Sequence, residues 1–114
     1  MNRDDLAKLV LMEIDRRCEA VRFRPRPPAW RWWETEAHDL DLRYGAEYSP
    51  SWFGELAATE ARRVRVLRTI YRLACSGLVV LVKSEGGRLE RLRLTETGRE
   101  AVAELRGAAT PVPT

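Results

Sequence analysis

The sequence predicts a single domain of the α+β class, mainly helical, on three observations. Its 114 residues fit one domain of ordinary size. Apolar residues recur at helical spacing in residues 4–21, 60–76 and 97–105. A β-rich run at 78–82 and an alternating run at 89–94 flank a glycine-containing turn, which is typical of a β-hairpin. We therefore expect several helices packed against one hairpin.

The first predicted helix, residues 4–21, has one broad apolar face. Asp4 and Asp5 suit its N-terminal end because negative charge is favourable there. Leu9 and Met12 lie off the apolar face, where they either form a second strip that faces a partner or are simply exposed to solvent. The apolar face consists of Leu6, Ala7, Val10, Leu11, Ile14, Cys18 and Val21.

Residues 22–47 form a connector rich in arginine, proline and tryptophan. The prolines exclude a regular helix over residues 22–29. Residues 34–43 are acidic and partly alternate leucine with aspartate, which fits either a short strand or a poor helix. Tyr44-Gly45 marks a turn at the end of this stretch.

Ser49-Pro50 predicts the start of a short helix, because serine caps a helix and proline is favoured at its first position. Thr59 can cap a second helix over residues 60–76, and Gly77 is a typical residue to end it. The buried stripe expected in the short helix is Phe53, Leu56 and Ala57.

The last predicted helix is short and buries Val102 and Leu105. Thr97, which has a glutamate three residues later, is a possible capping residue, and Thr95 is an equally plausible one. We expect residues 107–114 to form a flexible tail, since they are small and contain proline.

The formal net charge of +3 hides an uneven distribution along the chain. Residues 21–33 carry a net charge of +4, residues 34–60 of −6 and residues 61–93 of +7. Of the 20 basic residues 18 are arginine, which binds phosphate and guanine in a bidentate manner, although a GC-rich genome gives the same bias. This asymmetry indicates an anionic partner, unless the acidic and basic segments pair with each other on folding.

The predicted helix at 60–76 is the most informative stretch, because one of its faces is basic and carries no acid. Like charges at this spacing repel one another by about a few tenths of a kcal/mol per pair. Either acids from residues 34–60 or an external polyanion must offset that repulsion, and a DNA major groove accommodates an α-helix. The basic face holds Arg62, Arg65, Arg68, Thr69, Arg72 and Ser76, and the apolar face Val64, Val66, Leu67, Ile70, Tyr71, Leu73 and Ala74.

Two fragments of the chain match a known pattern. One is Val66-Leu67-Arg68-Thr69-Ile70-Tyr71-Arg72-Leu73 running into Gly77-Leu78-Val79, and the other is Leu94-Thr95 followed by Gly98-Arg99. On these fragments, residues 48–106 resemble the winged helix-turn-helix domain of bacterial MarR-like and PadR-like regulators. The resemblance implies a three-helix core with a two-stranded hairpin as the wing, preceded by the helix at 1–21 and the connector at 22–47.

The same resemblance implies a transcriptional regulator that binds double-stranded DNA sequence-specifically, with the helix at 60–76 in the major groove. It also implies a homodimer formed by the first helix, through Leu9 and Met12, with the last helix as a second candidate for the interface. The implied DNA contacts are Arg62, Arg65, Arg68, Thr69 and Arg72 on the recognition helix, Lys83 and Arg88 beside the wing tip, and Ser49 and Ser51 at the start of the preceding helix.

Two other functions fit this pattern. One is a winged-helix module that binds an acidic protein, and the other is a DNA-binding accessory factor in replication, plasmid maintenance or phage control. A steep salt dependence of duplex binding would distinguish DNA binding from protein binding.

Composition and the remaining motifs argue against other classes. No apolar run approaches the roughly 20 residues of a membrane span, and the N-terminus has no export signal. Cys18 and Cys75 are too few for a disulfide framework and are expected to be buried, so we expect a cytoplasmic protein. No catalytic motif predicts an enzyme, and His38 has no neighbouring ligand that predicts a metal or cofactor site.

Two features of the connector can be interpreted either as structural or as part of a binding site. Arg24-Pro25-Arg26-Pro27 resembles the Arg-Gly-Arg-Pro core of segments that insert into the DNA minor groove. Here proline replaces the central glycine, whose slim backbone lets such a core lie deep in the groove, so a stiff linker is the stronger interpretation. Trp30, Trp32 and Trp33 could line a ligand pocket or stack on bases, although packing in the core or at an interface is more common for such a cluster.

Overall fold

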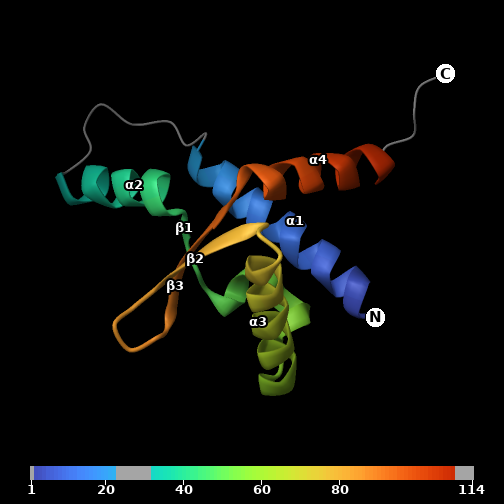
Figure 1. Ribbon diagram of the computed structural model, residues 1–114. Helices are drawn as coiled ribbons and strands as arrows, with labels where there is room; N and C mark the ends of the chain where they lie inside the picture. Colours follow the sequence, from blue (N-terminus) through green and yellow to red (C-terminus); the bar gives the residue numbers. More distant parts are fainter. Residues whose placement is uncertain (1, 23–31, 110–114) are drawn as a thin grey trace.

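The computed structural model describes residues 2–22 and 32–109 and shows a mainly helical α+β arrangement, which confirms the coarse fold class (Figure 1). The predictions for Arg24-Pro25-Arg26-Pro27, Trp30 and residues 110–114 lie outside the described residues, as does the side chain of Trp32. The elements are α1 (Arg3–Arg22), α2 (Trp32–Tyr44), β1 (Ala46–Glu47), the 3-10 helix η1 (Pro50–Ala57), α3 (Glu60–Cys75), β2 (Val79–Lys83), β3 (Leu89–Leu94) and α4 (Glu96–Ala109).

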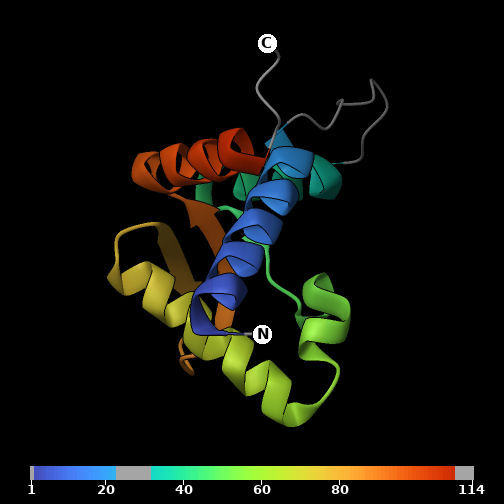
Figure 2. The ribbon, with the colours of Figure 1, turned by 90° about the vertical axis from the view of Figure 1, so that its right-hand side faces the viewer.

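Helix α1 is a central element of the fold. It contacts α3, β3 and α4, and Val10 and Ile14 on its predicted apolar face are completely buried. Figures 1 and 2 show α1 passing between α4 and α3. Helix α1 therefore belongs to the same hydrophobic core as η1, α3 and the hairpin. Leu9, which lies off the apolar face, is 41% exposed. The homodimer expected through Leu9 and Met12 stays a prediction.

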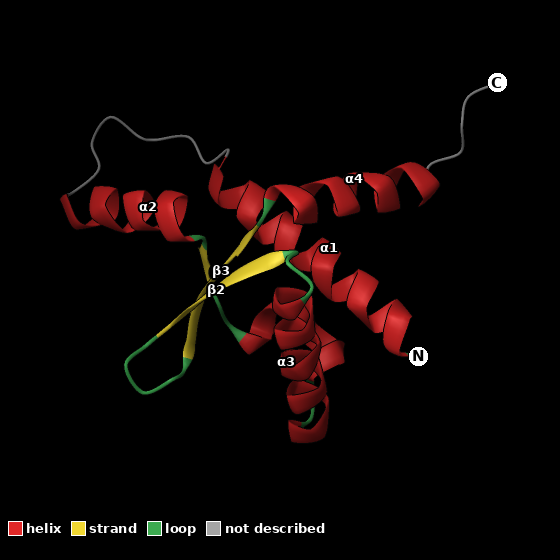
Figure 3. Ribbon diagram, in the orientation of Figure 1, coloured by secondary structure: helices red, strands yellow, loops and turns green. Residues whose placement is uncertain are grey.

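The sheet contains three antiparallel strands in the order β1-β3-β2 (Figure 3). The hairpin is confirmed: β2 and β3 pair with Val79 opposite Leu94 and Leu81 opposite Leu92. Strand β1 was not predicted. It pairs Ala46 with Leu92 on the other side of β3, and a two-residue strand has too short a pattern to recognise in the sequence.

Residues 34–43, which the sequence predicts as either a short strand or a poor helix, lie in helix α2. Leu40 and Leu42 are 38% and 53% exposed, so their alternation does not mark a buried face. The helix is held to β3 by Arg91, whose guanidinium pairs with the carboxylate of Asp41 and donates to the carbonyl of Gly45 at 3.1 Å. Trp33 is 48% exposed and so lies outside the core, contrary to the core-packing interpretation for this side chain.

The predicted starts of η1 and α3 are confirmed by their caps. Ser49 Oγ accepts a hydrogen bond from the amide of Ser51 at 3.3 Å, and Thr59 Oγ1 accepts one from the amide of Arg62 at 3.2 Å. Gly54 interrupts η1 with a positive φ of 49°, a conformation that favours glycine. These caps begin the two helices that precede the hairpin.

A tight corner joins the hairpin to α4, and Thr95 rather than Thr97 forms its cap. Thr95 Oγ1 accepts a hydrogen bond from the amide of Gly98 at 2.9 Å and donates to the carbonyl of Gly77 at 2.6 Å. A Cβ on Gly98 would lie 2.0 Å from the Leu78 carbonyl oxygen, so only glycine fits here. Helix α4 continues to Ala109, which shows that the predicted tail begins too early, at residue 107.

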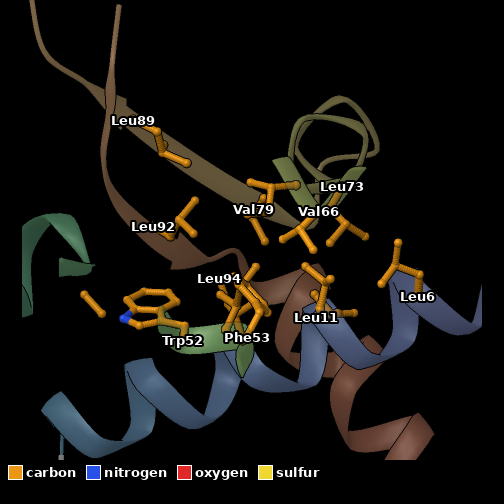
Figure 4. Close-up of a cluster of buried hydrophobic side chains, with 14 of the residues drawn as sticks. Leu6, Leu11, Trp52, Phe53, Val66, Leu73, Val79, Leu89, Leu92 and Leu94 are labelled. Carbon is orange, nitrogen blue, oxygen red and sulfur yellow. The ribbon is translucent and has the colours of Figure 1, made fainter. Parts of the chain in front are cut away.

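One hydrophobic core joins α1, β1, η1, α3, the two hairpin strands and α4 (Figure 4). Trp52 and Phe53 of η1 and Leu92 and Leu94 of β3 meet α1 and α3 there. Val66, Ile70 and Leu73 of the predicted apolar face of α3 are also buried in this core, whereas Val64 of that face is 43% exposed. In the two described ranges, no helix has a stretch long and apolar enough to span a membrane.

The two cysteines differ in solvent exposure, and the prediction that both are buried is wrong for Cys75. Cys75 is exposed in the last turn of α3, past the point where the helix packs on the core. Cys18 is half-buried, and its Sγ lies 3.5 Å from the Leu92 carbonyl oxygen. Burial raises the pKa of the Cys18 thiol above its ordinary value.

We expect Cys75 to react with a thiol reagent at neutral pH at least roughly tenfold faster than Cys18, because the thiolate is the reactive form and Cys18 is both shielded and less ionised. Stopped-flow labelling should show two phases. Cys75→Ser should remove the fast phase and Cys18→Ser the slow one. Equal rates for the two single-cysteine variants would contradict the burial of Cys18.

Candidate nucleic-acid interface

The exposed side of α3 is a basic surface. Arg62, Arg65, Arg68 and Arg72 are all exposed, while Val66 and Ile70 on the opposite side are buried in the core. This helix is positioned by its Thr59 cap, by Gly77 with a φ of 77°, and by contacts with α1 and η1. The core therefore holds α3 with its arginines toward solvent. We name Arg62, Arg65, Arg68 and Arg72 the basic face of α3.

Acids neutralise this face only in part. Glu55 lies 3.9 Å from Arg62, and both side chains are largely exposed, so solvent weakens the pair. Asp41 pairs with Arg91 at the sheet instead of with α3. Within residues 2–22 and 32–109, no acid forms an ion pair with Arg68 or Arg72. Pairing between the acidic and basic segments on folding therefore does not account for Arg68 and Arg72.

Thr69 does not belong to this face, contrary to the prediction that it contacts DNA. Thr69 is only 2% exposed, and its hydroxyl donates a hydrogen bond to the Arg65 carbonyl at 2.9 Å. Viewed down the helix axis, Thr69 lies next to Leu73 and Val66, which are buried in the core, so this edge of α3 is covered as well. A hydroxyl at the edge of an apolar face can be buried because the helix backbone satisfies it.

The hairpin places two further cations near α3. The ammonium of Lys83 lies 4.7 Å from the centre of the Tyr71 ring, a cation–π contact that joins the end of β2 to α3. Arg88 is exposed after the turn, where its amide donates to Ser84 Oγ at 3.2 Å. Figures 1 and 2 show the hairpin turn at the same end of the molecule as α3.

A groove of about 830 Å³ lies between α3 and the hairpin. Its charged lining is mixed, because Arg63, Arg88 and Arg91 share it with three glutamates. Arg63, on the apolar side of α3 but in its first turn, is exposed and lines this groove. The glutamates are Glu47, Glu60 and Glu90.

Ser49 and Ser51 lie at the start of η1, where they were predicted to meet phosphate. Their hydroxyl oxygens are 2.8 Å apart, and Ser49 Oγ is also the cap of η1. Ser51 is exposed, so its hydroxyl can bind an external group at the cost of its bond to Ser49.

Comparison of the chain with protein-family models, with curated proteins and with solved structures found no match. Among the described residues there is no group of three or more His, Cys, Asp or Glu side chains that could hold a metal ion. The basic face of α3 and the neighbouring hairpin are the features from which a function can be inferred.

Proposed function

We propose that this protein binds double-stranded DNA sequence-specifically as a winged helix-turn-helix transcriptional regulator, with α3 in the major groove. The observation that carries the proposal is the basic face of α3, where Arg68 and Arg72 are exposed and no described acid pairs with them. A row of guanidinium groups on one helix face suits guanine edges and phosphates, which accept bidentate hydrogen bonds.

The order of the elements supports the proposal. Over residues 48–106, η1 and α3 precede the β2–β3 hairpin and α4 follows it, which is the order that the resemblance to winged helix-turn-helix domains implies; α1 shares their core. The hairpin corresponds to the wing, and α3 to the recognition helix. Gly98 and Thr95 of the second matching fragment form the corner that fixes the hairpin against α4.

The residues divide into two proposed roles. Arg65, Arg68 and Arg72 point away from the core on the helix that would enter the groove, so they are the candidates for contacts to bases. Arg62, near the start of α3, and the cations of the hairpin lie at the edges of that surface, which suits contacts to phosphate. The edge group comprises Arg62, Lys83 and Arg88, with Ser51 as a hydroxyl donor.

A salt titration of duplex binding tests this function. If about five phosphates are contacted, the logarithm of the association constant should fall with the logarithm of salt concentration with a slope near −4 to −5. Fluorescence anisotropy with duplexes selected from a random pool measures this slope and the sequence preference together. A flat slope, or no duplex binding at low salt, would contradict DNA binding and favour the protein-binding alternative.

A further inference from the structure

Helix α2 exposes an apolar strip along one of its sides. Trp33, Leu40 and Tyr44 are all exposed, although each is a large apolar or aromatic residue. They follow one another at spacings of seven and four residues, which places them within about 40° of one another around the helix axis. We name these three residues the apolar strip of α2. Large apolar side chains that are aligned and exposed in this way are typical of a surface that another molecule covers.

The apolar strip is not the side by which α2 packs on the rest of the protein. That side carries His38, which is buried, and Asp41, which pairs with Arg91 of β3. Figure 1 shows α2 at one edge of the molecule, with its start pointing away from α3 and α4. The helix also lies outside residues 48–106, so the resemblance to winged helix-turn-helix regulators gives this accessible surface no role.

Two charges of opposite sign flank the apolar strip. Glu36 and Arg43 are seven residues apart, so they lie on the same flank, and both are exposed. Within residues 2–22 and 32–109, neither of them forms an ion pair. The guanidinium of Arg43 lies 5.9 Å from the centre of the Tyr44 ring, which holds it beside the strip. A partner that neutralises both charges must carry a base opposite Glu36 and an acid opposite Arg43, which is the order of the same helix run in reverse.

We propose that the apolar strip of α2 packs against the same strip of a second copy of this chain, with the two helices antiparallel. A two-fold axis near the middle of α2 then places Trp33 beside Tyr44 of the second copy and the two Leu40 side chains near the centre. Glu36 lies beside Arg43 of the second copy, and the symmetry forms this pair twice. A parallel pair would instead place Glu36 beside Asp41 of the second copy, so two acids would meet. The order of the charges therefore selects the antiparallel arrangement.

A contact through α2 alone is expected to be weak and dependent on protein concentration. The helix has 13 residues, and a single pair of helices this short stays below the roughly 1,200 Å² that a stable interface buries. The contact is distinct from the dimer predicted through Leu9 and Met12 of α1, and the two contacts together would join dimers into larger assemblies. It involves no residue of the basic face of α3, so it does not depend on DNA binding.

Sedimentation equilibrium over a range of protein concentrations, without DNA, tests the contact through its charges. Glu36→Arg and Arg43→Glu should each weaken self-association by about tenfold, since two attractive pairs become two repulsive ones. An equimolar mixture of the two variants should associate again, because every pair between the two kinds of chain then joins an acid to a base. The double variant should associate like the unmodified protein for the same reason. None of these substitutions alters α1, so association through Leu9 and Met12 contributes equally to all of them.

Leu40→Ser and Leu42→Ser are a matched pair that tests the apolar strip. Both leucines are exposed on α2, but Leu42 lies on the side opposite the strip. Leu40→Ser should weaken self-association by at least about fivefold, since it removes the central apolar contact, whereas Leu42→Ser should not change it. Circular dichroism checks that each variant keeps its helices. Equal effects of the two leucine variants would overturn the proposal. So would a mixture of the charge variants that associates no better than its components, or an unmodified protein that stays monomeric at every concentration.

Discussion

Replacing Arg65, Arg68 and Arg72 by glutamine in one variant is expected to weaken duplex DNA binding by on the order of a hundredfold or more at moderate salt. Each arginine that contacts a base or phosphate contributes roughly 1–3 kcal/mol, so the loss of three exceeds the loss from any single change. The salt slope should also become shallower by about one unit for each phosphate contact removed. Anisotropy titrations at several salt concentrations measure both effects.

A control must remove the same charge elsewhere. The triple change Arg3→Gln, Lys8→Gln and Arg16→Gln on exposed positions of α1 lowers the net charge equally and leaves α3 intact. It should reduce DNA affinity only slightly if the arginines of α3 contact DNA specifically, because none of these three charges belongs to α3. Equal losses from the two triple variants would contradict a specific role of α3, and unchanged binding by the α3 variant would place the DNA surface elsewhere.

Gly45→Ala is expected to destabilise the protein by at least about 3 kcal/mol, through a steric clash and backbone strain. Gly45 has a φ of 103°, and a Cβ on it would lie 2.0 Å from the Leu92 carbonyl oxygen. The same residue joins α2 to β1, donating its amide to Asp41 and accepting from Arg91. Urea unfolding, followed by the loss of helical circular dichroism, gives the change in unfolding free energy.

Gly107→Ala is the matched control for that substitution. Gly107 lies inside α4, and nothing lies within 4 Å of an added Cβ. Alanine should therefore stabilise the helix by about 0.5–1 kcal/mol, since it removes the entropic cost of glycine. If Gly45→Ala unfolds at the same urea concentration as Gly107→Ala, the close packing of Gly45 on β3 is refuted.

Patterns of neighbouring residues in the sequence are sufficient to predict several elements of the fold. The caps at Ser49 and Thr59, the glycine end of α3 and the alternation of Leu92 and Leu94 each depend on neighbours in the sequence, and the structure confirms them. The basic face of α3 is predictable for the same reason. Four arginines at helical spacing share a side whatever the tertiary fold is.

Other features depend on contacts between distant segments, which a local pattern does not contain. Helix α2 is held by the pair between Asp41 and Arg91, 50 residues apart in sequence, and β1 exists only because β3 offers it a free edge. The groove beside α3 likewise combines residues from several elements. The Asp15–Arg106 pair, which joins residues 91 apart in sequence, was missed because neither residue has an unusual local context.

The sequence by itself determined the mainly helical α+β class, the hairpin, the order of the helices around it and the concentration of arginine on α3, because each follows from short-range periodicity, capping and charge. Only the tertiary structure decided that α1 shares the core with α3, that Thr69 is buried while Cys75 is exposed, and that Gly45 and Gly98 lie against carbonyl groups of other segments. Burial and close approach depend on which elements pack together, and that packing is a property of the whole chain.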